Sequence, residues 1–204
     1  MHMPILRRAL PCLSLTLLLG CDVWPIPLKP DVPEENLSQF KYEGKDLSAQ
    51  NLSHWLKYGF WLGRVSQQGI ALEITGSIIP PYYGGKKYDL LFPTKITNTR
   101  AHPIRLTRND LAVSMDGEPP VRDSIDLFQV KLKQGENRTV STPTPSVNEI
   151  TIDSNGTALV DIRLRDDRLG DYEFLQSATL YLAAFHDIET GETIPFTIRF
   201  QKVK

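Results

Sequence analysis

Apolar and polar side chains alternate with a period of two over most of the chain beyond residue 69. The clearest instances are the segments 70–75, 158–165 and 194–203, in which every second residue, up to Phe200 in the last, is aliphatic or aromatic. Successive side chains of a β-strand point to opposite faces, so this alternation indicates strands with one face in a core and one in solvent. The segment 175–185 is apolar on both faces, which is typical of a central strand. The pattern therefore excludes a mainly helical fold.

Further strands and turns are predicted between these segments. Strands are expected at 88–97, 104–115, 128–133 and 150–152, with Phe128 and Val130 on the apolar face of the third. Asn155-Gly156 predicts a hairpin, because both central residues of a type I′ turn need positive φ, and 188–192 predicts another. Seven to nine short strands predict an all-β fold, an immunoglobulin-like antiparallel β-sandwich over residues 36–204. The Cys–Trp–Cys core of antibody domains is absent, so the likeness concerns the architecture alone.

Residues 46–58 are ambiguous. Asp46 or Ser48 is suited to cap one short helix, and a packed helix here would make the domain α+β. The aromatic residues that follow are expected to fill the core or seal one end of the domain, the alternative being a partner-binding surface; they are Trp55, Tyr58, Phe60 and Trp61.

The N-terminus carries a short apolar run behind two basic residues. Arg7 and Arg8 precede twelve mostly apolar residues, 9–20. A secretory signal has an apolar stretch of about 7–15 residues, whereas a membrane-spanning helix needs about 20. The run therefore predicts a signal peptide, residues 1–20, that is removed from the mature chain.

The run ends in Leu18-Leu19-Gly20-Cys21, which resembles the lipobox of bacterial lipoproteins. The resemblance implies cleavage before Cys21, acylation of its thiol and amine with palmitate-type chains, and a membrane-anchored protein that faces the periplasm. Asp22 resembles the signal that retains enteric lipoproteins in the inner membrane, which slightly favours that membrane over the outer one. The alternative is an ordinary secretory signal. Cys12 lies in the removed segment, so the mature chain can form no internal disulfide.

Residues 21–35 are rich in proline. Pro25, Pro27, Pro30 and Pro33 recur every two or three residues. Because proline fixes φ and lacks an N–H, this spacing predicts an extended spacer that lifts the domain about 40 Å from the bilayer. Trp24 is placed either at the lipid interface or on the domain.

The charged residues and histidines offer little chemistry. The 23 Lys and Arg balance 24 Asp and Glu, which excludes the basic footprint of a nucleic-acid-binding protein. Motifs for serine hydrolases, zinc proteases and dinucleotides are absent, so no catalytic residue, metal or cofactor is predicted. The mature chain's three histidines, His54, His102 and His186, are widely separated. The acidic segment 166–173 is interleaved with arginines, and a solvated loop is expected there rather than a calcium site.

The most suggestive surface segment is the loop 80–88. It combines prolines and glycines with five candidate binding residues: Tyr82, Tyr83, Lys86, Lys87 and Tyr88. Tyrosines supply contact area at low entropic cost, so the loop suits a peptide, glycan or anionic polymer. The alternative is an ordinary connection whose tyrosines pack inward.

Together these features favour a lipid-anchored, non-enzymatic interaction or assembly module of the cell envelope, with an envelope protein as its partner. A module that binds glycan or peptidoglycan through Tyr82, Tyr83 and Tyr88 is the first alternative. The second is a hydrolase whose catalytic groups are dispersed along the sequence.

Overall fold

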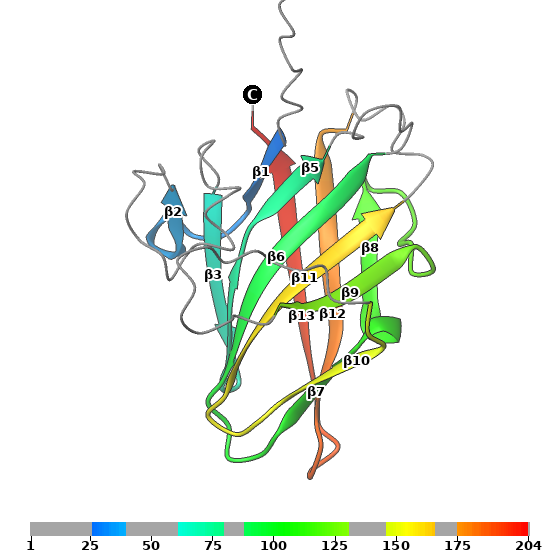
Figure 1. Ribbon diagram of the computed structural model, residues 1–204. Coiled ribbons are helices and arrows are strands. Elements are labelled where there is room, and N and C mark those ends of the chain that lie inside the picture. The colour runs from blue at the N-terminus through cyan, green and yellow to red at the C-terminus, as the bar shows by residue number, and fades with distance from the viewer. Residues whose placement is uncertain (1–25, 40–60, 80–87, 131–145, 166–174, 204) are drawn as a thin grey trace, which may run out of the picture.

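The computed structural model describes residues 26–39, 61–79, 88–130, 146–165 and 175–203. Within these ranges the chain forms a 13-stranded, almost entirely antiparallel arrangement with two short 3₁₀ turns (Figure 1). The strands are β1 (Ile26–Pro30), β2 (Leu37–Gln39), β3 (Trp61–Gln67), β4 (Ile70–Ile74), β5 (Gly76–Ile79), β6 (Asp89–Asn98), β7 (Ile104–Thr107), β8 (Leu111–Met115), β9 (Ile125–Val130), β10 (Glu149–Ile152), β11 (Thr157–Arg165), β12 (Ser177–Asp187) and β13 (Thr193–Lys202). The turns are η1 (Glu34–Asn36) and η3 (Arg108–Asp110). The predicted all-β class is confirmed.

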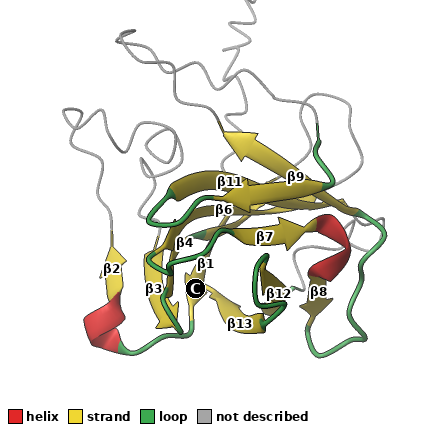
Figure 2. Ribbon diagram, turned by 90° about the horizontal axis from the view of Figure 1, so that it is seen from below, coloured by secondary structure: helices red, strands yellow, loops and turns green. Residues whose placement is uncertain are grey.

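The strands fold into two layers. The first sheet has the order β9–β11–β6–β4–β3–β2, and the second has the order β10–β7–β12–β13–β1, with β8 beside the other half of β12. Figure 2 shows β9, β11 and β6 in one layer and β8, β12 and β13 in the other. Strand β5 joins the layers, because it pairs with β6 on one side and β1 on the other. The arrangement is an open β-sandwich.

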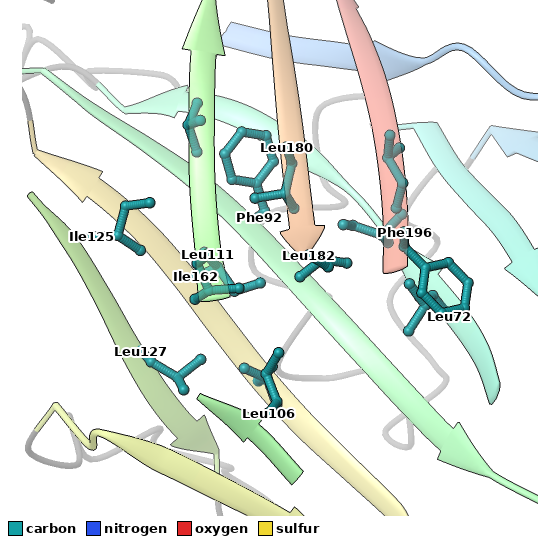
Figure 3. Packing of buried hydrophobic residues seen from close by; sticks show 14 of the residues in the cluster. Leu72, Phe92, Leu106, Leu111, Ile125, Leu127, Ile162, Leu180, Leu182 and Phe196 are labelled. Atoms are coloured by element: carbon teal, nitrogen blue, oxygen red, sulfur yellow. The ribbon is translucent and has the colours of Figure 1, made fainter. Parts of the chain in front are cut away.

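The buried side chains of both sheets meet between the layers (Figure 3). The ring centroids of Phe92 and Phe200 lie 5.0 Å apart, and Phe185 meets Phe196 edge-on at 5.5 Å. The predicted inward residues of 70–74, 158–164 and 194–200 are all buried, which confirms the alternation. Strand β12 has partners on both sides, so its interpretation as a central strand is also confirmed.

The N-terminal spacer is where the structure departs most from expectation. Residues 26–30 form β1, which pairs with β13 and β5. Leu28 is fully buried, and the Asp31 amide donates to the Arg199 carbonyl at 2.8 Å. The predicted spacer over 21–35 is therefore wrong from Ile26 onward, and the folded domain begins before residue 36. Proline is tolerated because β1 is short, with three register pairs to each neighbour, so few ladder hydrogen bonds are lost.

The Asn155-Gly156 turn does not close a hairpin. Asn155 has φ +54° and the Gly156 amide donates to the Asp153 carbonyl, yet β10 pairs with β7 and β11 pairs with β6 and β9. The turn carries the chain from one sheet to the other. Positive φ at two consecutive residues occurs instead at Gln68 (+47°) and Gly69 (+79°), which connect β3 to β4, and at Asp116 (+47°) and Gly117 (+83°), which follow β8. The predicted hairpin at 188–192 is confirmed by the pairing of β12 with β13.

Two strand predictions need correction. The expected strand 104–115 is interrupted by η3, which separates β7 from β8. In β9 the buried residues are Ile125 and Leu127, so Phe128 lies on the opposite face from the one predicted. The inward face follows the register with β11, in which Leu127 lies opposite Ile162. Residues 46–58, for which the sequence allows one short helix, lie outside the described ranges.

Candidate functional site

Most residues of the predicted binding loop lie outside the described ranges. The loop residues outside these ranges are Tyr82, Tyr83, Lys86 and Lys87. The predicted lipidation site Cys21, its neighbour Asp22 and the acidic segment 166–173 also lie outside them. Tyr88 is described: it is half-buried and packs against the core. Its ring therefore fills space at the start of β6. The role of the other four residues stays a prediction.

The outer face of the first sheet carries an apolar patch around a single carboxyl group. We call this patch the β11 face; it comprises Leu91, Pro93, Phe128, Leu159 and Asp161. The alternation of β11 turns Val160 and Ile162 into the core, so residues 159 and 161 point outward. In the sheet register Asp161 lies opposite Pro93 on β6 and Phe128 on β9. Phe128, Leu159 and Asp161 are half-buried, whereas Leu91 and Pro93 are buried.

The apolar residues around Asp161 perturb the pKa of its carboxyl group. Burial raises the pKa of its carboxyl from 3.8 to about 6, against the opposing effect of the Arg163 charge. An ionised group without close compensation in an apolar setting is costly, and such groups are enriched at functional sites. The β11 face therefore combines apolar side chains with a carboxyl group whose pKa is raised.

The side of the patch toward β2 carries an ion-pair ladder. Glu73 on β4 accepts from Lys95 Nζ at 3.0 Å and from Arg64 Nε at 3.3 Å, and Arg64 donates onward to the Ser38 hydroxyl at 2.7 Å. Burial raises the pKa of Glu73, but the hydrogen bonds and charges of Lys95 and Arg64 outweigh it and lower the pKa overall. These side chains are solvated and hold one another in place.

A second ion-pair cluster lies at the other end of the patch. Arg163 Nε donates to Asp89 Oδ2 at 2.7 Å, and Arg165 Nε lies 3.6 Å from Asp89 Oδ1. The β11 face is thus an apolar centre with charged groups on two sides. Protein–protein interfaces commonly have this composition, with apolar anchors inside a polar rim.

The outer face of the second sheet is different. Along β13 the outward residues are exposed and mostly polar: Thr193, Pro195, Thr197, Arg199 and Gln201. This face has the composition of a solvated surface. The β11 face is thus more apolar and less exposed than the outward face of β13.

The end of the sandwich at the β12–β13 hairpin is tied by a polar network. The Asn98 amide donates to the carbonyls of His102, Ile152 and Asp153 at 2.9–3.2 Å. Arg100 Nε donates to Asp187 at 3.1 Å. The pKa of Asp187 is lowered to about 2, first by the backbone amide of Thr190 and then by its hydroxyl, by Arg100 and by the amide of Glu189, although burial opposes this. These polar groups join three loops, which gives them a structural role.

One array has the composition of a hydrolase triad. His186 Nε2 lies 3.0 Å from Asp110 Oδ2, and His186 Nδ1 lies 3.3 Å from the Thr193 hydroxyl. His186 and Thr193 are also direct register partners in the β12–β13 ladder. Catalysis of acyl transfer needs free donors aimed at the developing oxyanion, and paired ladder strands commit their amides to one another. The array therefore locks β12, β13 and η3 together.

The described histidines do not share a ligand site. His102 Nδ1 lies 2.7 Å from Glu189 Oε2, whereas His186 contacts Asp110, and His54 lies outside the described ranges. Across those ranges, no three or more His, Cys, Asp or Glu side chains are grouped so as to hold a metal ion. The described part of the chain also contains no helix of the length and apolarity that a bilayer crossing requires.

No family model matches the chain, and no curated protein matches it in sequence. Among solved structures it is similar to the proposed lipoprotein ycdA of Bacillus subtilis subsp. subtilis str. 168, with 10% identity and a TM-score of 0.39 over 68% of this chain and 38% of that chain. It is also similar to a FixG-related protein from Vibrio parahaemolyticus, with 10% identity and a TM-score of 0.36 over 68% of this chain and 100% of that chain. The chain thus spans well under half of the length of ycdA.

Proposed function

We propose that this protein is a bacterial lipoprotein whose β-sandwich acts, without catalysis, as an interaction module of the cell envelope. The anchoring half of the proposal rests on Arg7, Arg8, the apolar run and the lipobox that ends in Cys21. Two acyl chains give a stable membrane attachment, which one chain does not. Asp22 favours retention in the inner membrane.

The interaction half rests on the contrast between the two outer faces of the sandwich. On the β11 face the half-buried Phe128 and Leu159 lie between charged groups, whereas the outward face of β13 is mostly polar. We assign the β11 face to a protein partner whose own surface contributes apolar side chains and a hydrogen-bond donor for Asp161. Contact would bury Phe128 and Leu159 fully, each gaining about 25 cal/mol for every Å² removed from water.

Anchoring is tested by fatty-acid labelling in the native host. The wild-type chain is expected to incorporate labelled palmitate and to sediment with membranes, and Cys21→Ala is expected to lose both properties. Cys12→Ala is the matched control, because residue 12 lies in the removed segment. A Cys21→Ala chain that stays membrane-bound would show that the lipobox is not the anchor. Replacement of Asp22 by Ser is expected to move the protein toward the outer membrane.

Partner binding is tested by site-specific photo-crosslinking in intact cells. A photoreactive residue in place of Leu159 is expected to give one discrete adduct, and the same residue in place of the exposed Thr197 is expected to give none. Leu159→Lys should abolish co-purification of the crosslinked protein, while Thr197→Lys should not. Equal adducts from both positions, or binding to the cell-wall sacculus that survives Leu159→Lys, would overturn the assignment.

A further inference from the structure

The entry of β1 into the sheet sets the length of the membrane tether. If Cys21 is the lipidated residue, as proposed above, only residues 22–25 separate it from Ile26, the first residue of β1. Five residue steps span at most about 18 Å when fully extended. The tether is therefore less than half as long as the proline-rich sequence alone predicts.

The chain has little freedom after residue 26. Ile26 lies opposite Ile78 of β5, and Leu28 lies opposite both Gly76 of β5 and Lys202 of β13. Leu28 is also fully buried. Lengthening the tether would require β1 to leave the sheet, which would expose Leu28 and break two ladders. The point of attachment is thus a fixed position on the rigid domain.

This position lies at one end of the sandwich. The end is shared by the start of β1, the end of β5, the start of β6 and the end of β13, as Figure 1 shows. The Val203 amide lies 3.4 Å from the Pro27 carbonyl, which puts the last described residue beside the first ones. The β12–β13 hairpin, with Ile188 exposed, lies at the opposite end. The ten residues of β13 run between the two ends and cover about 34 Å.

We infer that the domain stands end-on against the lipid bilayer, with the Ile26–Val203 end at the headgroups and the β12–β13 hairpin pointing away. The bilayer is then the partner of this end, and the exposed Val203 lies against it. The β11 face runs along the side of the sandwich and is presented upright beside the membrane. This inference rests on the proposed lipidation of Cys21.

The orientation is tested with fluorescent labels on single cysteines. The mature chain has Cys21 alone, and lipidation blocks its thiol, so Val203→Cys and Ile188→Cys each provide one site for the dye. Both positions are exposed, at 37% and 48%. The purified lipidated variants are placed in vesicles whose headgroups carry a nitroxide quencher. We expect quenching at residue 203 to be several-fold stronger than at residue 188.

A tether variant supplies the matched control. Twelve Gly and Ser residues inserted between residues 25 and 26 are expected to reduce quenching at residue 203 severalfold while thermal unfolding stays unchanged. Equal quenching at the two positions, or no effect of the insertion, would overturn the end-on orientation. The mass of the N-terminal peptide, measured on the same samples, separates the two proposals. An acylated peptide with equal quenching refutes the orientation alone, and an unacylated peptide refutes both.

Discussion

Replacement of Asp161 by Asn is expected to stabilise the protein at neutral pH. Burial among Pro93 and Phe128 raises the pKa of the carboxyl from 3.8 to about 6. Each pKa unit corresponds to about 1.36 kcal/mol, so the ionised carboxylate costs the folded state up to about 3 kcal/mol at pH 7. Asn has nearly the same shape and never ionises, so it removes this cost.

The sign of the pH dependence follows from the same shift. Below pH 3.8 the carboxyl is protonated in both the folded and unfolded states, and it contributes no pH dependence. Between 3.8 and about 6 the folded state keeps a proton that the unfolded state has released, so stability falls as pH rises. Above about 6 the penalty is constant. The stability difference between Asp161→Asn and wild type should therefore grow from near zero at pH 3.5 to its full value at pH 7.

Urea unfolding, followed by circular dichroism at half-unit steps from pH 3.5 to 7.5, measures this difference directly. Other titrating groups are common to both proteins and cancel in the subtraction. Thr197→Ala, at an exposed position of β13, is the control: it removes no titratable group, so its stability difference from wild type should stay flat with pH. A difference that stays flat with pH, or an Asp161→Asn protein that is less stable at pH 7, would refute the argument from burial.

Three further substitutions test the fold. Leu28→Ala should cost about 2–5 kcal/mol in the free energy of unfolding, whereas the half-buried Lys29→Ala should cost less than about 1 kcal/mol; equal small losses would mean that β1 does not belong to the core. Gly76→Ala places a Cβ 2.8 Å from the Phe200 ring, so it should lower stability by about 1–3 kcal/mol, and an unchanged melting temperature would contradict this close approach. Asp187→Asn should destabilise the protein at pH 7, and acid titration should show the deficit shrinking as pH falls from about 4 to 2, because the unfolded wild-type chain takes up a proton near pH 3.8 whereas the folded carboxyl does so only near 2.

The candidate site was only partly visible in the sequence. The sequence favours the tyrosines of the loop 80–88 as binding residues, and Tyr88, the one that the structure describes, packs against the core. The residues of the β11 face come from β6, β9 and β11, and only the register brings them together. One local signal was present: Leu159 is an apolar residue at an outward position of an alternating strand. The raised pKa of Asp161 had no such signal, because it depends on neighbours that are distant in sequence.

The sequence by itself determined the all-β class, the buried face of β4, β11 and β13, and the prediction of a lipid anchor. These properties depend on the spacing of residues along the chain, because a period of two is a local property of the strand. Only the tertiary structure decided which strands pair. Asn155 predicts a turn whether or not the two strands beside it pair with each other. In the structure they do not, because β10 and β11 belong to different sheets. The same holds for β1, whose prolines weaken the strand signal while β5 and β13 supply partners on both sides. Strand pairing is a contact between distant segments, and that contact places residues 26–30 of the predicted 40 Å spacer in the sheet.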